Sequence, residues 1–162
     1  MKALTAVAAA LLACALVVSC SSPGTTNNTT PPPPGGSQFT VAASIDGTPY
    51  SAAATMTIAT ISSMYFVDVK SATGSQSLEL LFRFPTNSAF PKNLNQSTGF
   101  TATYNDGAAS YSDSAGTATV TVNSFSYSYA DTAFSADFTF KAKGGTSTLT
   151  VKNFTAGTVR HN

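Results

Sequence analysis

Few side chains in this chain of 162 residues could carry acid–base or nucleophilic chemistry. His161 is the single histidine and is followed only by Asn162, so we expect it to be frayed and solvated. Glu79 is the single glutamate and falls at a polar position of an alternating segment, so we expect it to be solvated too. A Ser–His–acid triad would need His161, and a glycosidase pair would need Glu79. We therefore predict no catalytic residue and do not expect an enzyme.

The aspartates leave one metal site open. Four of them fall in segments typical of turns, where Asp bonds to nearby backbone groups: Asp46, Asp106, Asp113 and Asp131. Two such turns at one end of the domain could share a calcium ion, which takes about six to eight oxygen ligands. No local Asp-x-Asp spacing supports this, so turn formation is the preferred interpretation. One histidine and no cysteine after position 20 predict no zinc site, and nothing indicates a cofactor.

Tyrosines are the best candidates for a binding surface, because the ring offers a flat apolar face and a polar tip. The candidates for a sugar- or peptide-binding surface are Tyr104, Tyr111, Tyr127 and Tyr129, together with the neighbouring Phe125. Core packing is the alternative for each, since it accounts for most aromatic residues of an all-β domain. The segment 85–98 is long for a hairpin loop and contains Phe90. Long loops often carry function, but they also merely cross between sheets.

Residues 1–19 have the features of an export signal. Lys2 supplies a positive charge, residues 3–18 are almost wholly apolar, and a small residue precedes Cys20. The stretch Val17-Val18-Ser19-Cys20 resembles the lipobox of bacterial lipoproteins. The resemblance implies cleavage between Ser19 and Cys20, a diacylglycerol on the Cys20 thiol, and an acyl chain such as palmitate on the new amino group.

Other interpretations of the N-terminus remain. Leu11-Leu12-Ala13-Cys14 is a competing match, but Cys20 lies where apolar sequence gives way to polar sequence. An ordinary cleaved signal with a chance cysteine, or a short membrane anchor, is the further alternative. Two acyl chains anchor firmly, because each buried methylene contributes about 0.8 kcal/mol. We expect attachment to the outer membrane, since Ser21 resembles the default for sorting there; the periplasmic and surface faces both remain open.

Residues 20–37 are predicted to be the lipidated cysteine and a tether. Residues 21–37 read SSPGTTNNTTPPPPGGS, and the four prolines at 31–34 favour a stiff polyproline II segment. A spacer that lifts the domain off the bilayer is the main interpretation. A Pro-rich recognition motif for a partner is the alternative.

The charge balance limits the class of partner. Eight basic residues minus Lys2 leave seven against seven acidic residues in the exported part, which is formally neutral. A neutral chain without a basic cluster offers no electrostatic footprint for nucleic acid, so we do not expect nucleic-acid binding. An envelope protein or a glycan is the expected partner, and the oligomeric state stays open.

Residues 38–162 are predicted to form one all-β domain. Apolar and polar residues alternate in about eight or nine segments, of which the clearest are 39–45, 64–70, 78–84 and 134–141. Asp46-Gly47 and Thr73-Gly74-Ser75 predict tight turns, and a phase shift at Asn123-Ser124 predicts a β-bulge. We predict a single antiparallel β-sandwich, because many large aromatics occupy inward positions; a small closed β-barrel is the alternative.

The order of short motifs in this domain resembles an uncharacterised family of short all-β bacterial lipoproteins. The motifs cover most of 39–159 and read SIDGTPYSA, GFTATY, YSDSAGTATVTV, FSADFTFKA and LTVKNFTAGTV. The chain departs from the pattern near 134–137 and at 153–154, where a glycine is expected. The family has no activity to carry over, so the resemblance implies fold and location alone.

These observations predict a membrane-anchored lipoprotein that acts as a non-catalytic binding or scaffolding module in the envelope. The alternative function is a carrier that holds a lipid or another apolar ligand inside a small β-barrel. The alanine-rich stretches at 52–54 and 108–109 would leave space near one mouth of such a barrel.

Overall fold

The computed structural model describes residues 39–114, 116–128, 132–144 and 150–162. The predicted signal, Cys20 and the tether lie outside these ranges, as do Tyr129 and Asp131. None of the described ranges contains a helix long and apolar enough to cross a membrane. The strands are β1 (Phe39–Ile45), β2 (Thr48–Ile61), β3 (Met64–Thr73), β4 (Gln76–Pro85), β5 (Lys92–Leu94), β6 (Phe100–Asn105), β7 (Ser110–Asp113), β8 (Thr119–Tyr127), β9 (Thr132–Gly144) and β10 (Thr150–His161).

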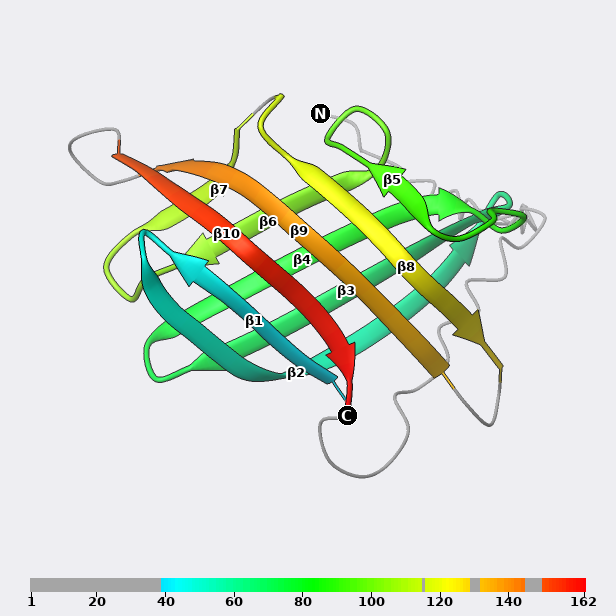
Figure 1. The fold of residues 1–162 in the computed structure, drawn as a ribbon, viewed down its shortest axis with the longest axis horizontal. Helices are drawn as coiled ribbons and strands as arrows, with labels where there is room; N and C mark the ends of the chain where they lie inside the picture. The colour runs from blue at the N-terminus through cyan, green and yellow to red at the C-terminus, as the bar shows by residue number, and fades with distance from the viewer. Residues whose placement is uncertain (1–38, 115, 129–131, 145–149) are drawn as a thin grey trace, which may run out of the picture.

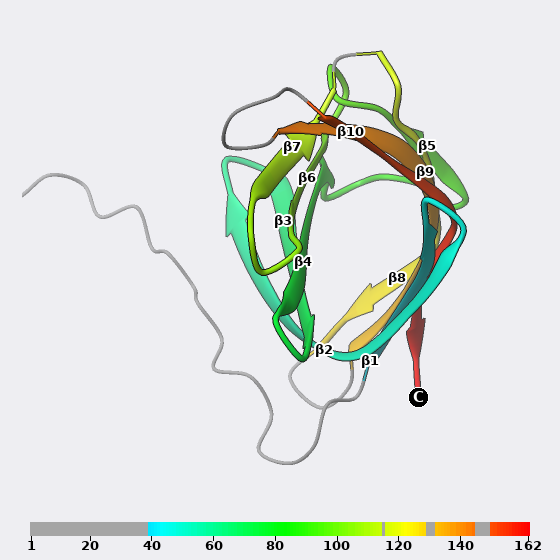
Figure 2. The same cartoon turned by 90° about the vertical axis from the view of Figure 1, so that its left-hand side faces the viewer.

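Eight of these strands form a closed antiparallel β-barrel (Figure 1). Neighbours follow the order β10-β1-β2-β3-β4-β6-β7-β9, and β9 pairs back with β10. The other two strands extend the wall outside the ring, with β8 on β9 and β5 on β8. Figure 2 shows a flattened barrel, with β3, β4 and β6 on one side and β1, β9 and β10 on the other.

The prediction of a sandwich is wrong, and the barrel alternative is confirmed. A sandwich keeps two sheets without backbone pairing at their common edges. Here β2 pairs with β1 up to Ala54 and with β3 from Ala54 onward, so it carries the hydrogen bonding around one corner. At the other corner β9 pairs with both β10 and β7. Inward aromatic residues did not distinguish the folds, because they pack equally well inside a flattened barrel.

The predicted turns and bulge are confirmed. Asp46 and Gly47 both have positive φ, 50° and 84°, and form the two-residue connection between β1 and β2. Gly74, with a φ of 59°, and Ser75 form the two-residue connection between β3 and β4. The register of β8 against β9 shifts between Val122 and Ser124, which leaves Asn123 as the extra residue of the bulge. The bulge reverses the alternation of inward and outward side chains, so Phe125 and Tyr127 return to the inner side of β8.

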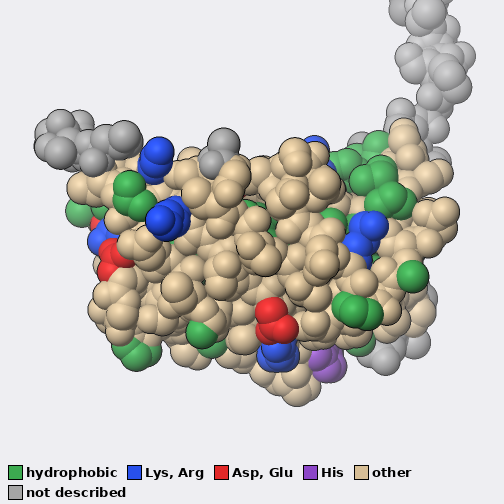
Figure 3. Space-filling view, turned by 45° about the horizontal axis from the view of Figure 1, so that its top comes forward, with side chains coloured by type: hydrophobic (Ala, Val, Ile, Leu, Met, Phe, Trp, Pro, Cys, Tyr) green, Lys and Arg blue, Asp and Glu red, His purple; other side chains and the backbone are tan. Residues whose placement is uncertain are grey.

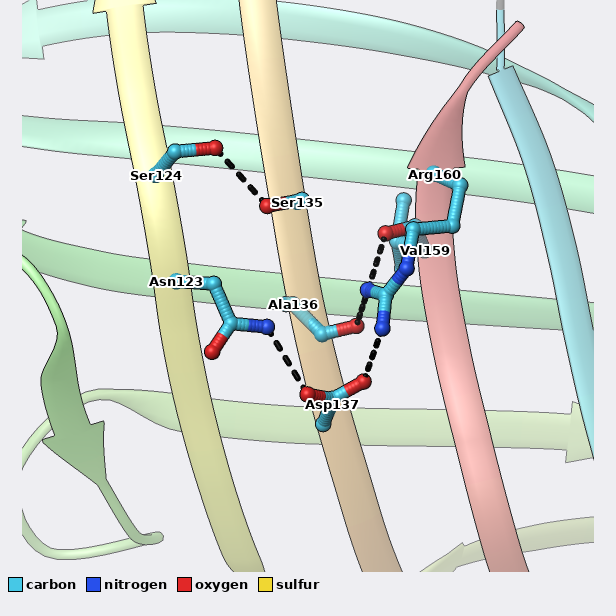
Figure 4. A network of polar contacts seen from close by, with 7 residues as sticks. All are labelled: Asn123, Ser124, Ser135, Ala136, Asp137, Val159 and Arg160. Carbon is cyan, nitrogen blue, oxygen red and sulfur yellow. Dashed lines mark hydrogen bonds and ion pairs between the residues drawn. The ribbon is translucent and has the colours of Figure 1, made fainter.

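A polar network on the outside of the barrel fixes this bulged strand (Figure 4). Asn123 Nδ2 donates to Asp137 Oδ2 at 2.8 Å, and the hydroxyls of Ser124 and Ser135 share a hydrogen bond of 2.7 Å. Arg160 on β10 bonds to the Asp137 carboxylate and donates to the Ala136 carbonyl oxygen at 2.8 Å. The amide of Asn123, followed by Arg160, holds the pKa of Asp137 below its usual value. The network thus ties β8, β9 and β10 together.

Aromatic rings occupy the middle of the barrel. Phe82 packs against Phe100 and Phe134 with ring centroids 5.4 and 5.0 Å apart. Phe140 stacks on Phe154 at 4.2 Å, and every one of these rings is buried. Such contacts add about 0.5–1.5 kcal/mol each to the burial of apolar area. A ligand site therefore has to be sought at the ends of the barrel.

Candidate functional site

The structure does not bring the predicted tyrosines together on one surface. Tyr104 and Tyr111 are opposite residues of β6 and β7, are only 2% and 6% exposed, and pack with ring centroids 5.9 Å apart. They therefore occupy the core positions named as the alternative. Tyr127 is half-buried at the end of β8, in a different part of the barrel, and Tyr129 lies outside the described residues.

Three of the four aspartates at the predicted turns lie within the described residues, and each uses its carboxylate within the fold. Asp106 Oδ1 accepts the amides of Ala108 and Ala109 at 2.9 and 2.8 Å, which lowers the pKa of this carboxyl. Asp46 accepts the amide of Asn153 at 2.8 Å, its pKa is lowered chiefly by that bond, and Lys152 pairs with it at 3.4 Å. Turn formation and ion pairing account for these oxygens.

Asp113 is likewise committed to backbone and side-chain partners. Its Oδ1 accepts the amide of Ala102 at 3.1 Å, and its Oδ2 accepts a bond from Gln96. Within the described ranges no group of three or more His, Cys, Asp and Glu side chains could hold a metal ion.

Glu79 lies on the outside, as the alternation predicts, whereas His161 is exposed but not frayed, because it pairs with Phe39 between β10 and β1. His161 is the last residue of β10, and its ring packs against Phe39 at 5.0 Å. Glu79 is exposed on β4 and pairs with Lys70 at 3.0 Å. Asp68 pairs with the same Lys70 at 3.2 Å, and burial raises its pKa. Two carboxylates thus share one ammonium group on the outer wall of the barrel.

A cleft of about 220 Å³ lies at one end of the barrel, where β3 begins and β4 and β8 end. Its nine lining residues are Tyr65 on β3, Phe84 and Pro85 on β4, Thr86, Ser88 and Phe90 in the following loop, and Phe125, Ser126 and Tyr127 on β8. Tyr104 pairs with Leu78 near the start of β4, six residues from Phe84. The cleft is thus about 20 Å along the strand from the tyrosines of the core.

The cleft forms because the strands around it end their pairing early. β6 pairs with β4 only as far as Phe82, and β5 pairs with β8 only at Val120–Val122. No described strand therefore separates the end of β4 from the end of β8. The loop after β4 enters this space and is fixed at its start, because Thr86 donates its amide to the Ser63 carbonyl oxygen at 2.9 Å.

The cleft walls are aromatic rings that pack edge to face. Phe84 is fully buried and contacts Phe90 and Phe125 with ring centroids 5.4 and 5.1 Å apart. Tyr65 contacts Phe125 at 4.8 Å and Tyr127 at 6.3 Å. The four rings other than Phe84 are half-buried, so each keeps apolar surface available for contact. The packing of the rings against one another holds them in place.

The polar groups of the cleft are hydroxyls. Among the described residues, Ser88 Oγ is buried and has no hydrogen-bond partner. A buried hydroxyl without a partner costs about 1–3 kcal/mol, and a turn of the Ser88 side chain toward the cleft would let a ligand oxygen or nitrogen relieve that cost. None of the nine lining residues is charged. In Figure 3, hydrophobic side chains gather at the right-hand end of the face in view. This is the end of the barrel where Figure 1 shows β5.

Sequence reasoning found part of this site. It identified Tyr127, the long loop with Phe90, and the phase shift that returns Phe125 to the inner side of β8. It did not identify Tyr65 or Phe84, because each belongs to a regular alternating segment and their meeting depends on the register of β3 against β4.

Comparisons with known proteins give no information about the ligand of the cleft. No protein-family model, no curated protein and no solved structure matches the chain. The resemblance to a family of short bacterial lipoproteins stays a prediction, and the function has to be argued from the site itself.

Proposed function

We propose that this protein is a lipid-anchored envelope protein whose β-barrel domain binds a neutral, ring-containing ligand in the aromatic cleft without transforming it. The observation that carries the proposal is the combination of half-buried rings with the unpartnered Ser88 hydroxyl in an uncharged cleft. Binding sites for small molecules are typically apolar with a few placed polar groups. The anchor rests on the sequence pattern that ends at Cys20.

The size of the cleft limits the ligand. Its volume of about 220 Å³ is below the range of about 300–1,000 Å³ typical of sites for whole drug-sized molecules. The cleft therefore accepts one ring, or the end of a larger molecule. A pyranose of an envelope glycan, or a proline or aromatic side chain of a partner protein, has the required flat apolar face and hydrogen-bonding groups.

The experiment is a titration of the isotope-labelled protein, followed by NMR, with neutral saccharides and with uncharged peptides that contain proline or aromatic residues. We expect shifts confined to Tyr65, Ser88, Phe90, Phe125 and Tyr127 for at least one class. Shifts confined to the outer wall around Phe66, with these residues unmoved, would contradict the proposal.

A carrier of an apolar ligand is the second candidate, favoured by the five aromatic residues among the nine that line the same cleft. The rings that occupy the middle of the barrel leave the cleft as the place for such a ligand. Native mass spectrometry of the protein taken from its own host distinguishes the two. A co-purified mass that extracts into organic solvent favours the carrier, and a saccharide or peptide mass favours the binding module.

A further inference from the structure

The Pro-rich run at 31–34 has the chemistry that the aromatic cleft would recognise. Consecutive prolines favour polyproline II, and such segments bind grooves lined with aromatic rings. A proline has no backbone N–H and offers only its carbonyl oxygen as a hydrogen-bonding group. The unpartnered Ser88 hydroxyl can donate to that oxygen once its side chain turns toward the cleft. Neither the nine lining residues nor residues 21–37 carry a charge, so no ion has to be desolvated.

The run is also close enough in the chain to reach the cleft. β1 begins at Phe39, which pairs with His161 of β10. Val159 of β10 pairs with Ala136 of β9, so His161 lies level with Phe134, which pairs with Phe125 of the cleft. Phe39 and Phe125 are thus three strand spacings apart, or about 15 Å. Pro34 is five residues before Phe39, and five extended residues span about 16–18 Å, so the end of the run nearest the barrel reaches the cleft when this segment is extended.

We propose that the Pro31–Pro34 run of this chain docks in the aromatic cleft of its own barrel and competes with external ligands. This inference rests on the proposed function, because it assigns an internal competitor to the same site. Docking would hold the domain close to its anchor, whereas an external ligand would release the full length of the tether. The Pro-rich segment would then act as a recognition motif for its own domain as well as a spacer.

The strength of the competition follows from the short linker. Segments joined by a short flexible linker have effective concentrations on the order of 1 mM. If the Pro-rich run binds the cleft with an intrinsic dissociation constant of about 0.1 mM, the tethered run occupies the cleft most of the time. A separate peptide of the same sequence then binds about 11-fold more weakly than it would bind an empty cleft. External ligands of the cleft are weakened by the same factor.

The test measures fluorescence anisotropy of a capped, neutral-dye-labelled peptide NTTPPPPGGS, residues 28–37, with the full chain in detergent. It is repeated on the full chain in which all four prolines are serine (P31S, P32S, P33S, P34S). We expect the four-serine chain to bind the peptide about tenfold more tightly than the unchanged chain. Adding Tyr127→Ala to the four-serine chain removes this binding, whereas Phe66→Ala, which alters a half-buried ring of the outer wall, preserves it.

Equal affinity of the two chains, or binding to neither, would overturn the inference. Binding that survives Tyr127→Ala would overturn it too, because the peptide would then dock elsewhere. A difference that disappears on dilution of the protein would assign the contact to a second copy and contradict docking within one chain. The proposed function is judged separately, since a neutral saccharide that shifts the cleft residues of the four-serine chain supports it in each of these cases.

Discussion

Replacement of Gly144 by alanine tests the closure of the barrel. Gly144 of β9 pairs with Tyr111 of β7 on one side and with Thr150 of β10 on the other, so it lies where β9 closes the barrel. A Cβ at this position would lie 2.0 Å from the Ser110 carbonyl oxygen and 2.8 Å from the Tyr111 Cα. Both are backbone atoms, so β7 would have to move away by about 1 Å to restore ordinary contact.

The expected loss of stability is large for a single methyl group. Overpacking costs about 1–3 kcal/mol, and a lost strand hydrogen bond adds about 1 kcal/mol. We expect the free energy of unfolding to fall by about 2–4 kcal/mol, and Tm by about 4 °C for each kcal/mol. β7 contributes only three register pairs to β9, so faster amide hydrogen exchange at Ser112 and Asp113 should accompany the loss.

Urea titration followed by near-UV circular dichroism measures the change, and Lys143→Ala is the matched control. Lys143 is the neighbouring exposed residue of β9, and its truncation should change the free energy by less than about 0.5 kcal/mol. A Gly144→Ala protein as stable as this control, with unchanged exchange at Ser112, would refute the closure of β7 on β9.

Four further predictions concern buried and charged groups and the N-terminal pattern. The hydroxyl of Tyr50 shares a buried hydrogen bond of 3.0 Å with Ser71. Ser71→Ala should therefore cost about 1–3 kcal/mol in urea titrations, and adding Tyr50→Phe should restore most of it. Burial raises the pKa of Asp68 above 3.8, so its ionisation opposes folding at neutral pH; Asp68→Asn should stabilise the protein at pH 7, and its advantage should vanish as the pH falls below 3.8. Asp137 has a lowered pKa, so the stability it contributes is present above pH 3.8 and is lost as the pH falls through its folded-state pKa; Asp137→Asn should flatten the acid limb of the stability profile, and an unchanged limb would contradict the role of its network. Cys20→Ala should abolish incorporation of labelled palmitate in the bacterial host, whereas Cys14→Ala should retain it; the opposite result would move the lipid to Cys14.

The local features of the fold could be predicted from the sequence because short-range rules decide them. Asp46-Gly47 adopts the positive φ values that a two-residue hairpin connection requires. The extra residue of the bulge, Asn123, is visible in the sequence as a phase shift in the alternation of apolar and polar residues. Closure of the barrel depends on which distant strands pair. The corner at Ala54 of β2 has the same alternating pattern as a straight strand, so the sequence could not separate the barrel from the sandwich.

The candidate site shows the same division. Tyr104 and Tyr127 occur in similar alternating segments, yet one lies in the core and the other lines the cleft. Their environments differ because Tyr104 lies on β6 between β4 and β7 and packs against Phe154, whereas no described strand lies between the ends of β4 and β8 beside Tyr127. Strand length and pairing, which alternation does not encode, therefore decide which aromatic residues remain available for a ligand.

The most direct test of the cleft is the affinity of one neutral ligand, found by the NMR titration, for two matched variants. Tyr127→Ala removes a ring that lines the cleft, and Phe66→Ala removes a half-buried ring of the outer wall. Isothermal titration calorimetry should show binding about 2- to 13-fold weaker for Tyr127→Ala, which corresponds to about 0.5–1.5 kcal/mol for one aromatic contact. Phe66→Ala should bind as the unchanged protein does. Equal affinities for both variants and the unchanged protein would contradict binding in the aromatic cleft.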